Sequence, residues 1–349
     1  MKTWDGESLV SRRDAETNAW MFVALHSSRL GPSTGGTRMI PYDDLASARR
    51  DAMRLSEGMT YKWAAAGFPR GGGKGVIAAP PGLDVRARAG LLRRYGQLVK
   101  DLGGRFWTGA DAGTSAADMD VIAETGTPYV FSRTEGNGGA GGSGPWTALG
   151  LFASLEAVCG RLFGAASLAG RRVLVQGAGS VGRPLIERLA AAGARVSFSD
   201  IEPDASRLPS GIAATYVSPE SLFDTDCDVF APCALGAVLN AGTIPRLRCR
   251  AVVGAANNQL AELEDAERLR AAGLLYAPDF VVNAGGAIAI TGIEALGWSR
   301  EKAEREVEGI AGTLSGILDL ADSEGITTEA AARRVAERHI AGARTGSAK

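Results

Sequence analysis

The chain has 349 residues, of which 45% are hydrophobic and 22% are charged, and its formal net charge is −1. This length is sufficient for two domains with substantial cores, and the near-neutral charge offers no field for a polyanion, so we expect a soluble two-domain protein that does not bind nucleic acid. The polar N-terminus lacks the apolar segment of a signal peptide and no run approaches the length of a membrane span, which predicts a cytoplasmic location and no membrane partner.

Strand and helix signals alternate to about residue 130, beginning with a predicted strand at Trp20–Leu25. The helix that follows has apolar residues spaced by three and four, which predicts a core-facing stripe that includes Lys62. The stripe holds no acidic residue, and burying an ammonium without an anion costs several kcal/mol, so we expect the substrate to supply the anion. The members of the stripe are Leu45, Ala48, Ala52, Leu55, Met59 and Lys62.

A second lysine, Lys74, follows three glycines and precedes a short buried strand predicted at Gly75–Ala79. Glycines let a ligand approach the backbone closely, so the ammonium is expected to project into a cleft. Burial lowers the pKa of a lysine toward neutrality, where it can accept and return a proton. The alternative is a glycine-rich loop whose lysine extends into solvent.

Two aspartates farther along have different explanations. Asp84 is placed to cap a helix, and the strand that begins at Phe106 ends at a loop containing Asp111. Ser115 and Asp118 have the spacing of a capping box, which accounts for Asp118. Asp111 instead lies at the carboxyl end of a strand, where open α/β sheets gather ligand-binding residues.

The glycine-rich segment Thr134–Pro145 is the strongest change of composition in the chain. We interpret it as a hinge that lets two domains close over a cleft, with a surface loop as the alternative. The expected divisions are an N-terminal α/β substrate domain at 1–143, a nucleotide domain at 144–325 and a C-terminal helical tail at 326–349 that could pack back on the rest of the chain.

The second half of the chain carries a dinucleotide-binding pattern. A strand at Arg171–Gln176 runs into the turn Gly177–Gly182 (GAGSVG) and a helix, and a second strand ends at Asp200, 18 residues after Gly182. This context predicts a doubly wound parallel sheet with the pyrophosphate at the helix N-terminus. Asp200 would accept hydrogen bonds from both ribose hydroxyls and repel a 2′-phosphate, which favours NAD, although Arg207 could offer a cation to that phosphate. Later strands of the same sheet are expected at Cys227–Ala231, Ala251–Ala256 and Leu274–Ala277.

Taken together, these motifs resemble the glutamate/leucine/phenylalanine/valine dehydrogenase superfamily, with phenylalanine and leucine dehydrogenases the nearest branches. The resemblance extends from about residue 20 to about residue 300, and its motifs occur in the family's order. They are Gly35–Met39 (GGTRM), Gly58–Lys62 (GMTYK), Gly71–Lys74 (GGGK), Thr108–Asp111 (TGAD), the GAGSVG turn, Gly254–Asn258 (GAANN) and Pro278–Gly286 (PDFVVNAGG).

The resemblance implies a role for each matching residue. Lys62 and the backbone at Gly35 and Gly36 bind the α-carboxylate of the substrate. Lys74 is the general base for the attacking water, and Asp111 carries protons to and from the amine. The residues assigned to NAD or to the nicotinamide are Gly177, Gly179, Ser180, Val181, Gly182, Asp200, Ile201, Cys233, Ala234, Ala255, Asn257 and Asn283, of which Asn257 also contacts substrate.

The reaction implied is oxidative deamination, in which an L-amino acid, NAD⁺ and water give a 2-oxo acid, ammonia and NADH. Hydride leaves Cα, water adds to the iminium, and ammonia leaves. No metal is required, in keeping with only two histidines and four cysteines that form no CxxC pair.

The side chain of the substrate is less clearly indicated. Glutamate-specific relatives carry lysine immediately before the Gly-Gly pair, whereas this chain has Thr34, which disfavours glutamate and also departs from the leucine usual in the other branches. Small residues at Gly109 and Ala287 suggest room for a bulky or aromatic group such as that of phenylalanine, and Ile290 is assigned to the same pocket. Trp146 would instead narrow the pocket.

Two other interpretations remain open. The first is a branched-chain leucine or valine dehydrogenase. The second is a catalytically silent NAD-binding regulator, which would require loss of Lys62, Lys74 or Asp111, and all three are present. We also expect a homo-oligomer, a dimer or an octamer, because an exposed N-terminal strand could pair edge to edge across a twofold axis.

Overall fold

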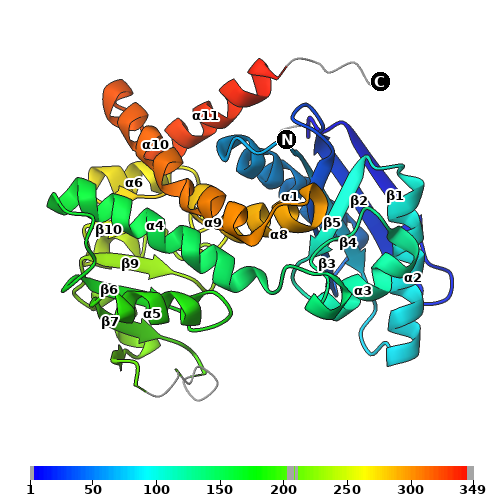
Figure 1. Ribbon diagram of the computed structural model, residues 1–349, viewed down its shortest axis with the longest axis horizontal. Coiled ribbons are helices and arrows are strands. Elements are labelled where there is room, and N and C mark those ends of the chain that lie inside the picture. Colours follow the sequence, from blue (N-terminus) through cyan, green and yellow to red (C-terminus); the bar gives the residue numbers. More distant parts are fainter. Residues whose placement is uncertain (1–3, 203–207, 209–210, 344–349) are drawn as a thin grey trace. The chain divides into compact units, whose positions relative to one another are not determined.

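The computed structural model describes residues 4–202, 208 and 211–343, which form two compact units (Figure 1). The first unit contains the chain up to Gly142, together with Ile290–Trp298 and the residues from Ala336 onward. The second contains Ser143–Ala289 and Ser299–Val335. The two-domain α/β class predicted from the sequence is confirmed.

The chain passes between the units more often than the predicted divisions at 144–325 and 326–349 allow. The rings of Trp298 and Phe68 meet edge to face with centroids 5.5 Å apart, and the Trp298 ring fills the space beside Gly292. His339 Nδ1 lies 2.6 Å from the carbonyl oxygen of Ala64. These contacts tie two late segments to the first unit, and local sequence patterns could not show them because each joins residues far apart in the chain.

The first unit is built on a five-stranded sheet in the order β1-β2-β4-β3-β5. β1 and β2 pair antiparallel, as do β2 and β4, whereas β3 is parallel to both of its neighbours. The sequence predictions did not include β1 or β3, and β3 has two glycines and an arginine in place of a regular apolar alternation. The strands are β1 Ser8–Arg13, β2 Trp20–Ser27, β3 Ser33–Ile40, β4 Gly71–Ala78 and β5 Phe106–Ala110.

Helices cover both faces of this sheet. α1 (Leu45–Ala65) packs on one face, where Ala48 and Ala52 meet apolar side chains of β2 and β4. α2 (Val85–Asp101) and α3 (Ala116–Gly126) cover the other. The predicted caps are confirmed: the Asp84 side chain accepts from the backbone N–H of Ala87 at 2.8 Å, and Ser115 and Asp118 form both bonds of a capping box.

The buried stripe of α1 differs from the predicted one. Leu45 is 45% exposed and Lys62 is half-buried, so the prediction that Lys62 lies within the core-facing stripe is wrong. A Cβ at Gly72 would lie 2.3 Å from the backbone nitrogen of Thr60, so the helix approaches the glycines of β4 too closely for large residues. Small side chains therefore form most of the stripe, which consists of Ala48, Ala52, Ser56, Thr60 and Trp63.

The second unit contains the predicted parallel sheet, with six strands in the order β11-β10-β9-β6-β7-β8. The order reverses between β6 and β9, the arrangement of a doubly wound fold. β8 was absent from the predictions. The strands are β6 Arg172–Gln176, β7 Arg195–Ser199, β8 Ala214–Tyr216, β9 Val229–Pro232, β10 Ala251–Val252 and β11 Leu275–Tyr276.

Helices bury both faces of the second sheet (Figure 1). One cluster joins α4, α5 and α10 to Val173 and Val175 of β6, and another packs α6 beneath Leu174 and Phe230. The remaining helices of the chain, of which α8 and α11 are shared between the units, are α4 Ser143–Phe163, α5 Gly182–Ala191, α6 Asp265–Ala271, α7 Asp279–Val282, α8 Gly285–Leu296, α9 Arg300–Glu308, α10 Ile310–Glu324 and α11 Thr328–Gly342.

The glycine-rich segment Thr134–Pro145 is more ordered than a simple linker. It contains a 3₁₀ turn at Glu135–Asn137, and α4 already begins at Ser143. A Cβ at Gly144 would lie 2.0 Å from the carbonyl oxygen of Ser180, so this glycine permits close packing within the second unit. Within this segment, the change from the first unit to the second therefore falls just before Ser143.

Two helical stretches are long and apolar enough to cross a membrane by length and composition, although the sequence was expected to hold none. They are Ser143–Phe163 and Asp279–Leu296, of which 56% and 67% are buried inside the structure. Burial of this extent is that of helices packed in a protein core.

Candidate active site

Lys74 and Asp111 meet in the first unit. Lys74 lies in β4 and Asp111 immediately follows β5, and Lys74 Nζ is 3.0 Å from Asp111 Oδ2. Lys74 is 4% exposed, which excludes the alternative of a lysine extended into solvent. The two groups that the family resemblance assigned to proton transfer are thus direct neighbours.

The surroundings of the pair set its charge. Burial lowers the pKa of Lys74 below its usual 10.5, and the attraction of Asp111 only partly offsets this effect. Burial would raise the pKa of Asp111, but the positive charges of Lys74 and Arg38 outweigh it and bring that pKa to about 2. Asp111 is therefore a carboxylate at neutral pH, beside a lysine whose proton is easier to remove than usual.

Glycines bring the backbone close to this pair. The glycines before Lys74 belong to β4 itself and do not form a loop. A Cβ at Gly35 would lie 1.9 Å from the carbonyl oxygen of Gly73, and one at Gly36 would lie 2.8 Å from Asp111 Cβ. Side chains at these positions would displace the strands or the carboxylate, so the glycines keep the backbone next to Asp111 accessible.

Sequence reasoning missed three polar residues behind Asp111. Arg38 Nε donates to Asp111 Oδ2 at 2.9 Å, and Arg38 Nη1 donates to Asp51 Oδ2 at 3.0 Å. The hydroxyl of Tyr42 donates to the same Asp51 oxygen at 2.7 Å. An arginine two residues after the Gly-Gly pair of a buried strand needs a carboxylate partner, and that requirement was the available signal.

Two of the residues expected to shape a pocket for the substrate side chain, Thr34 and Gly109, are engaged in contacts within the first unit. The Thr34 hydroxyl is buried and donates to the carbonyl oxygen of Pro32 at 2.9 Å. A Cβ at Gly109 would lie 2.5 Å from the ring of Phe131, so packing against Phe131 already explains this glycine. The contribution of Gly109 to a substrate pocket stays a prediction.

The other members of that predicted pocket lie in or near α8 and α4. Ile290 is 3% exposed and packs with the first unit, whereas Ala287 is half-buried in the second. Trp146 is buried in α4, and the guanidinium of Arg300 lies 4.9 Å from the centre of its ring. Packing within the second unit thus accounts for the position of Trp146.

The Gly-rich turn of the second unit has the geometry expected for dinucleotide binding. Gly177 has φ +89, as a tight turn requires, and a Cβ at Gly182 would lie 1.8 Å from the Gly177 carbonyl oxygen. A Cβ at Gly179 would meet nothing within 4 Å, so the backbone there is open to a ligand. Ser180 and Val181 complete the turn before α5 begins at Gly182.

Asp200 lies directly after β7, beside this turn. Its Oδ2 accepts from the backbone N–H of Ala178 at 2.9 Å, and its Oδ1 accepts from that of Glu202 at 2.9 Å. A carboxylate at this place is the group that the ribose hydroxyls of a dinucleotide use as acceptor. The neighbouring Ile201 is 82% exposed, and Arg207 lies outside the described residues.

An unsatisfied acceptor lies at the same edge of the sheet. Asn283 Nδ2 donates to Asn257 Oδ1 at 2.8 Å and to the carbonyl oxygen of Ala255 at 3.2 Å. Asn283 Oδ1 is buried and has no hydrogen-bond partner among the described residues. A primary amide such as the carboxamide of nicotinamide would supply the missing donor. Cys233 donates its backbone N–H to Gln176, and Ala234 packs beside the turn at Gly177.

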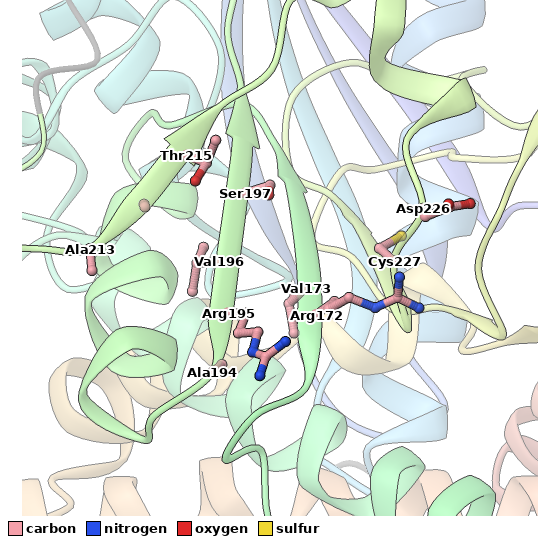
Figure 2. Close-up of a pocket in the computed structure, with 11 residues that line it drawn as sticks. Arg172, Val173, Ala194, Arg195, Val196, Ser197, Ala213, Thr215, Asp226 and Cys227 are labelled. Carbon is pink, nitrogen blue, oxygen red and sulfur yellow. The ribbon is translucent and has the colours of Figure 1, made fainter.

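A pocket of ≈ 610 Å³ lies at the opposite edge of this sheet (Figure 2). Figure 2 shows the side chains of Arg172 and Arg195 at the amino ends of neighbouring strands, with Asp226 and Cys227 beside them. The GAGSVG turn follows the carboxyl end of β6, so this pocket is separate from the nucleotide-binding edge.

Comparison with known proteins places these features in a family. Residues 10–127 match the Glu/Leu/Phe/Val dehydrogenase dimerisation domain, and residues 202–346 match the Glutamate/Leucine/Phenylalanine/Valine dehydrogenase domain. Leucine dehydrogenase of Thermoactinomyces intermedius is 41% identical over 341 residues, covering 97% of this chain and 92% of the relative. Phenylalanine dehydrogenase of Lysinibacillus sphaericus is 40% identical over 345 residues, covering 97% and 90%.

A solved structure agrees with the sequence relatives. The crystal structure of L-tryptophan dehydrogenase from Nostoc punctiforme superimposes with a TM-score of 0.83 at 38% identity and covers 97% of both chains. Family matches, full-length relatives and fold lead to the same assignment, which the sequence motifs had predicted: the chain belongs to the Glu/Leu/Phe/Val dehydrogenase family of NAD(P)-dependent amino acid dehydrogenases.

Proposed function

We propose that this enzyme catalyses the NAD-dependent oxidative deamination of an L-amino acid with a bulky apolar or aromatic side chain. The observation that carries the proposal is the buried pair of Lys74 Nζ and Asp111 Oδ2, 3.0 Å apart. A lysine with a lowered pKa beside a permanent carboxylate is suited to take a proton from water and pass protons to and from an amine.

The residues of the chain divide the work as follows. NAD, when bound, supplies the acceptor for the hydride that leaves Cα. Lys62 and the backbone at Gly35 and Gly36 bind the α-carboxylate. Lys74, in its neutral form, removes a proton from the water that adds to Cα. Asp111 takes a proton from the substrate ammonium and returns a proton to the departing amine. The balance is amino acid, NAD⁺ and water to 2-oxo acid, ammonium, NADH and one proton.

NAD is the proposed cofactor, since the chain offers the groups to hold it. The open backbone at Gly179 and the start of α5 suit the pyrophosphate, and Asp200 offers acceptors to the ribose hydroxyls. The unpaired Asn283 Oδ1 suits the carboxamide. A carboxylate at Asp200 would repel the 2′-phosphate of NADP, which supports a preference for NAD.

Substrate choice is supported by two further observations. Thr34 is uncharged and offers no cation to a γ-carboxylate, and its hydroxyl is already bonded to the carbonyl oxygen of Pro32. The relatives named for leucine, phenylalanine and tryptophan show that large apolar side chains are accepted within the family. A branched-chain preference is the second candidate, favoured by the similarity to leucine dehydrogenases. We also propose a homo-oligomer, a dimer or an octamer, which the match to a dimerisation domain supports, and a cytoplasmic location.

The test is a set of initial rates with L-phenylalanine, L-tryptophan, L-leucine, L-valine and L-glutamate, each with NAD⁺ and with NADP⁺. We expect the highest kcat/KM for one of the four apolar substrates with NAD⁺, and the lowest for glutamate. Absence of activity with every L-amino acid, in protein that binds NADH, would favour a catalytically silent NAD-binding regulator.

A further inference from the structure

Arg38 connects the proposed proton-transfer pair to helix α1. In β3 it lies opposite Val76 of β4 and one step beyond the last pair with β5, where Thr37 lies opposite Ala110. Its guanidinium donates through Nε to Asp111 Oδ2 and through Nη1 to Asp51 Oδ2. A single planar cation thus joins the carboxylate beside Lys74 to a carboxylate on the helix above the sheet.

We propose that Arg38 is a positioning residue that fixes Asp111 in one orientation and that, balanced by Asp51, sets the charge around Lys74. This inference rests on the proposed deamination, for which it specifies how the carboxylate that exchanges protons with the amine is oriented. Arg38 itself is not expected to contact the substrate.

The contacts of Asp111 are unequal between its two oxygens. Both Lys74 Nζ and Arg38 Nε reach Oδ2, at 3.0 and 2.9 Å. Among the described residues, no hydrogen bond reaches Oδ1, and the backbone N–H of Asp111 donates to the hydroxyl of Thr114. Two cations therefore fix Oδ2, and Oδ1 remains as the acceptor that can exchange a proton with the substrate amine.

Asp51 fixes Arg38 from the other side. Its Oδ2 accepts from Arg38 and from the hydroxyl of Tyr42, and its Oδ1 accepts from Arg54 at 2.9 Å. Ala48 and Ala52 keep α1 close to the sheet, so the short aspartate side chain can reach Arg38. The side chains of Arg38 and Asp51 are 22% and 15% exposed, which shields the pair from solvent and makes its geometry more rigid than that of a surface ion pair.

Arg38 and Asp51 act on Lys74 with opposite signs. Burial lowers the pKa of Lys74 most. The charged groups that act on it next are Asp111, directly after β5, Arg38 in β3 and Asp51 in α1. Arg38 lowers the pKa of Lys74, and Asp51 and Asp111 raise it. Loss of Arg38 should therefore raise the pKa at which Lys74 becomes a base, and loss of Asp51 should lower it.

The test uses this opposition in the variants Arg38→Met and Asp51→Asn. We expect Arg38→Met to reduce kcat by about tenfold or more, as misplacement of a proton donor does, and to move the lysine limb of the kcat–pH profile to higher pH. Asp51→Asn should move the same limb to lower pH. In Arg38→Lys the positive charge is kept, so the lysine limb of the kcat–pH profile should stay near that of wild type. The lysine side chain cannot bond to both carboxylates, so kcat should remain low.

A second readout does not depend on turnover. The rate at which acetic anhydride labels Lys74, followed by peptide mass spectrometry across pH, reports the pKa of that lysine in each variant. The matched control is Arg94→Met, which removes a comparably shielded arginine from its pair with Asp14 in the same unit. The proposal is supported if the lysine limb and the labelling midpoint move to higher pH in Arg38→Met and to lower pH in Asp51→Asn. Neither should move in the control.

Two outcomes separate this inference from the proposed function. Wild-type kcat and an unchanged labelling midpoint in folded Arg38→Met would overturn the positioning role even if deamination is confirmed. If the wild-type protein deaminates no amino acid, the proposed function fails, and the labelling midpoints still decide whether Arg38 and Asp51 set the charge of Lys74.

Discussion

Lys74 Nζ lies 3.0 Å from Asp111 Oδ2, and burial of the lysine favours loss of its proton. We expect Lys74→Ala to lower kcat for deamination by at least about 100-fold, since general acid-base groups contribute that much. NADH affinity should stay nearly unchanged, because the GAGSVG turn lies in the other unit. Stopped-flow kinetics and fluorescence titration with NADH measure the two effects.

The same experiment on Asp111→Asn should give a similar loss. Lys100→Ala, which removes an exposed lysine of α2, is the control for a generic loss of charge. Retention of kcat within about tenfold of wild type in Lys74→Ala would contradict the assignment of the general base.

The pH dependence of kcat should show a lysine limb and no aspartate limb. Burial places the pKa of Lys74 below its usual 10.5, and deamination needs the neutral amine, so kcat should rise with pH through a limb below that value. Asp111, with a pKa of about 2, stays ionised throughout the working range and adds no limb. Measuring kcat at saturating substrate across pH checks this prediction, because titration of the free substrate does not affect kcat. A carboxylate limb near neutral pH would show that Asp111 is less well paired than the geometry indicates.

Two glycines of the nucleotide turn should respond differently to the same substitution. Gly182→Ala places a Cβ 1.8 Å from the Gly177 carbonyl oxygen, so it should lower the melting temperature as well as NAD affinity. Gly179→Ala meets nothing within 4 Å, so it should fold like wild type and lose affinity only through collision with the bound pyrophosphate. Calorimetric unfolding and NADH titration of both variants measure the contrast. Equal melting temperatures for the two would contradict the close packing at Gly182.

Cofactor preference should depend on Asp200. Asp200→Ala removes the acceptors for the ribose hydroxyls, so KM for NAD⁺ should rise and its advantage over NADP⁺ should narrow. The carboxylate also accepts from the backbone N–H groups of Ala178 and Glu202, so Asp200→Asn is the variant that keeps one acceptor while removing the charge. A wild-type preference for NADP⁺ would show that the interpretation of Asp200 is wrong.

Local patterns predicted part of this structure, and long-range packing decided the rest. The caps at Asp84 and Ser115 and the strand–turn–helix at Gly177–Gly182 depend on neighbours in the chain, and they were predicted correctly. β3 was missed because its stability comes from backbone ladders to β4 and β5, which are distant in sequence.

The same distinction holds within the candidate site. Lys74 and Asp111 were identified by motif, yet Arg38 and Asp51 became visible only when the fold brought β3, β5 and α1 together. The buried stripe of α1 differs from the predicted one because the helix lies against the glycines of β4, where only small side chains fit. A pattern of apolar spacing does not contain that information.

The last prediction concerns Lys62, which lies half-buried in the last turn of α1. If its ammonium binds the substrate carboxylate, Lys62→Met should raise KM for amino acids sharply, because the uncharged chain of similar length cannot pair with that group. Activity toward simple amines that lack the carboxylate should fall much less, since they never used the contact. Rates with L-phenylalanine and 2-phenylethylamine in wild type and variant measure the difference. An equal loss for both substrates, or an unchanged KM with a lower melting temperature, would show that Lys62 serves the fold of the first unit instead of the substrate.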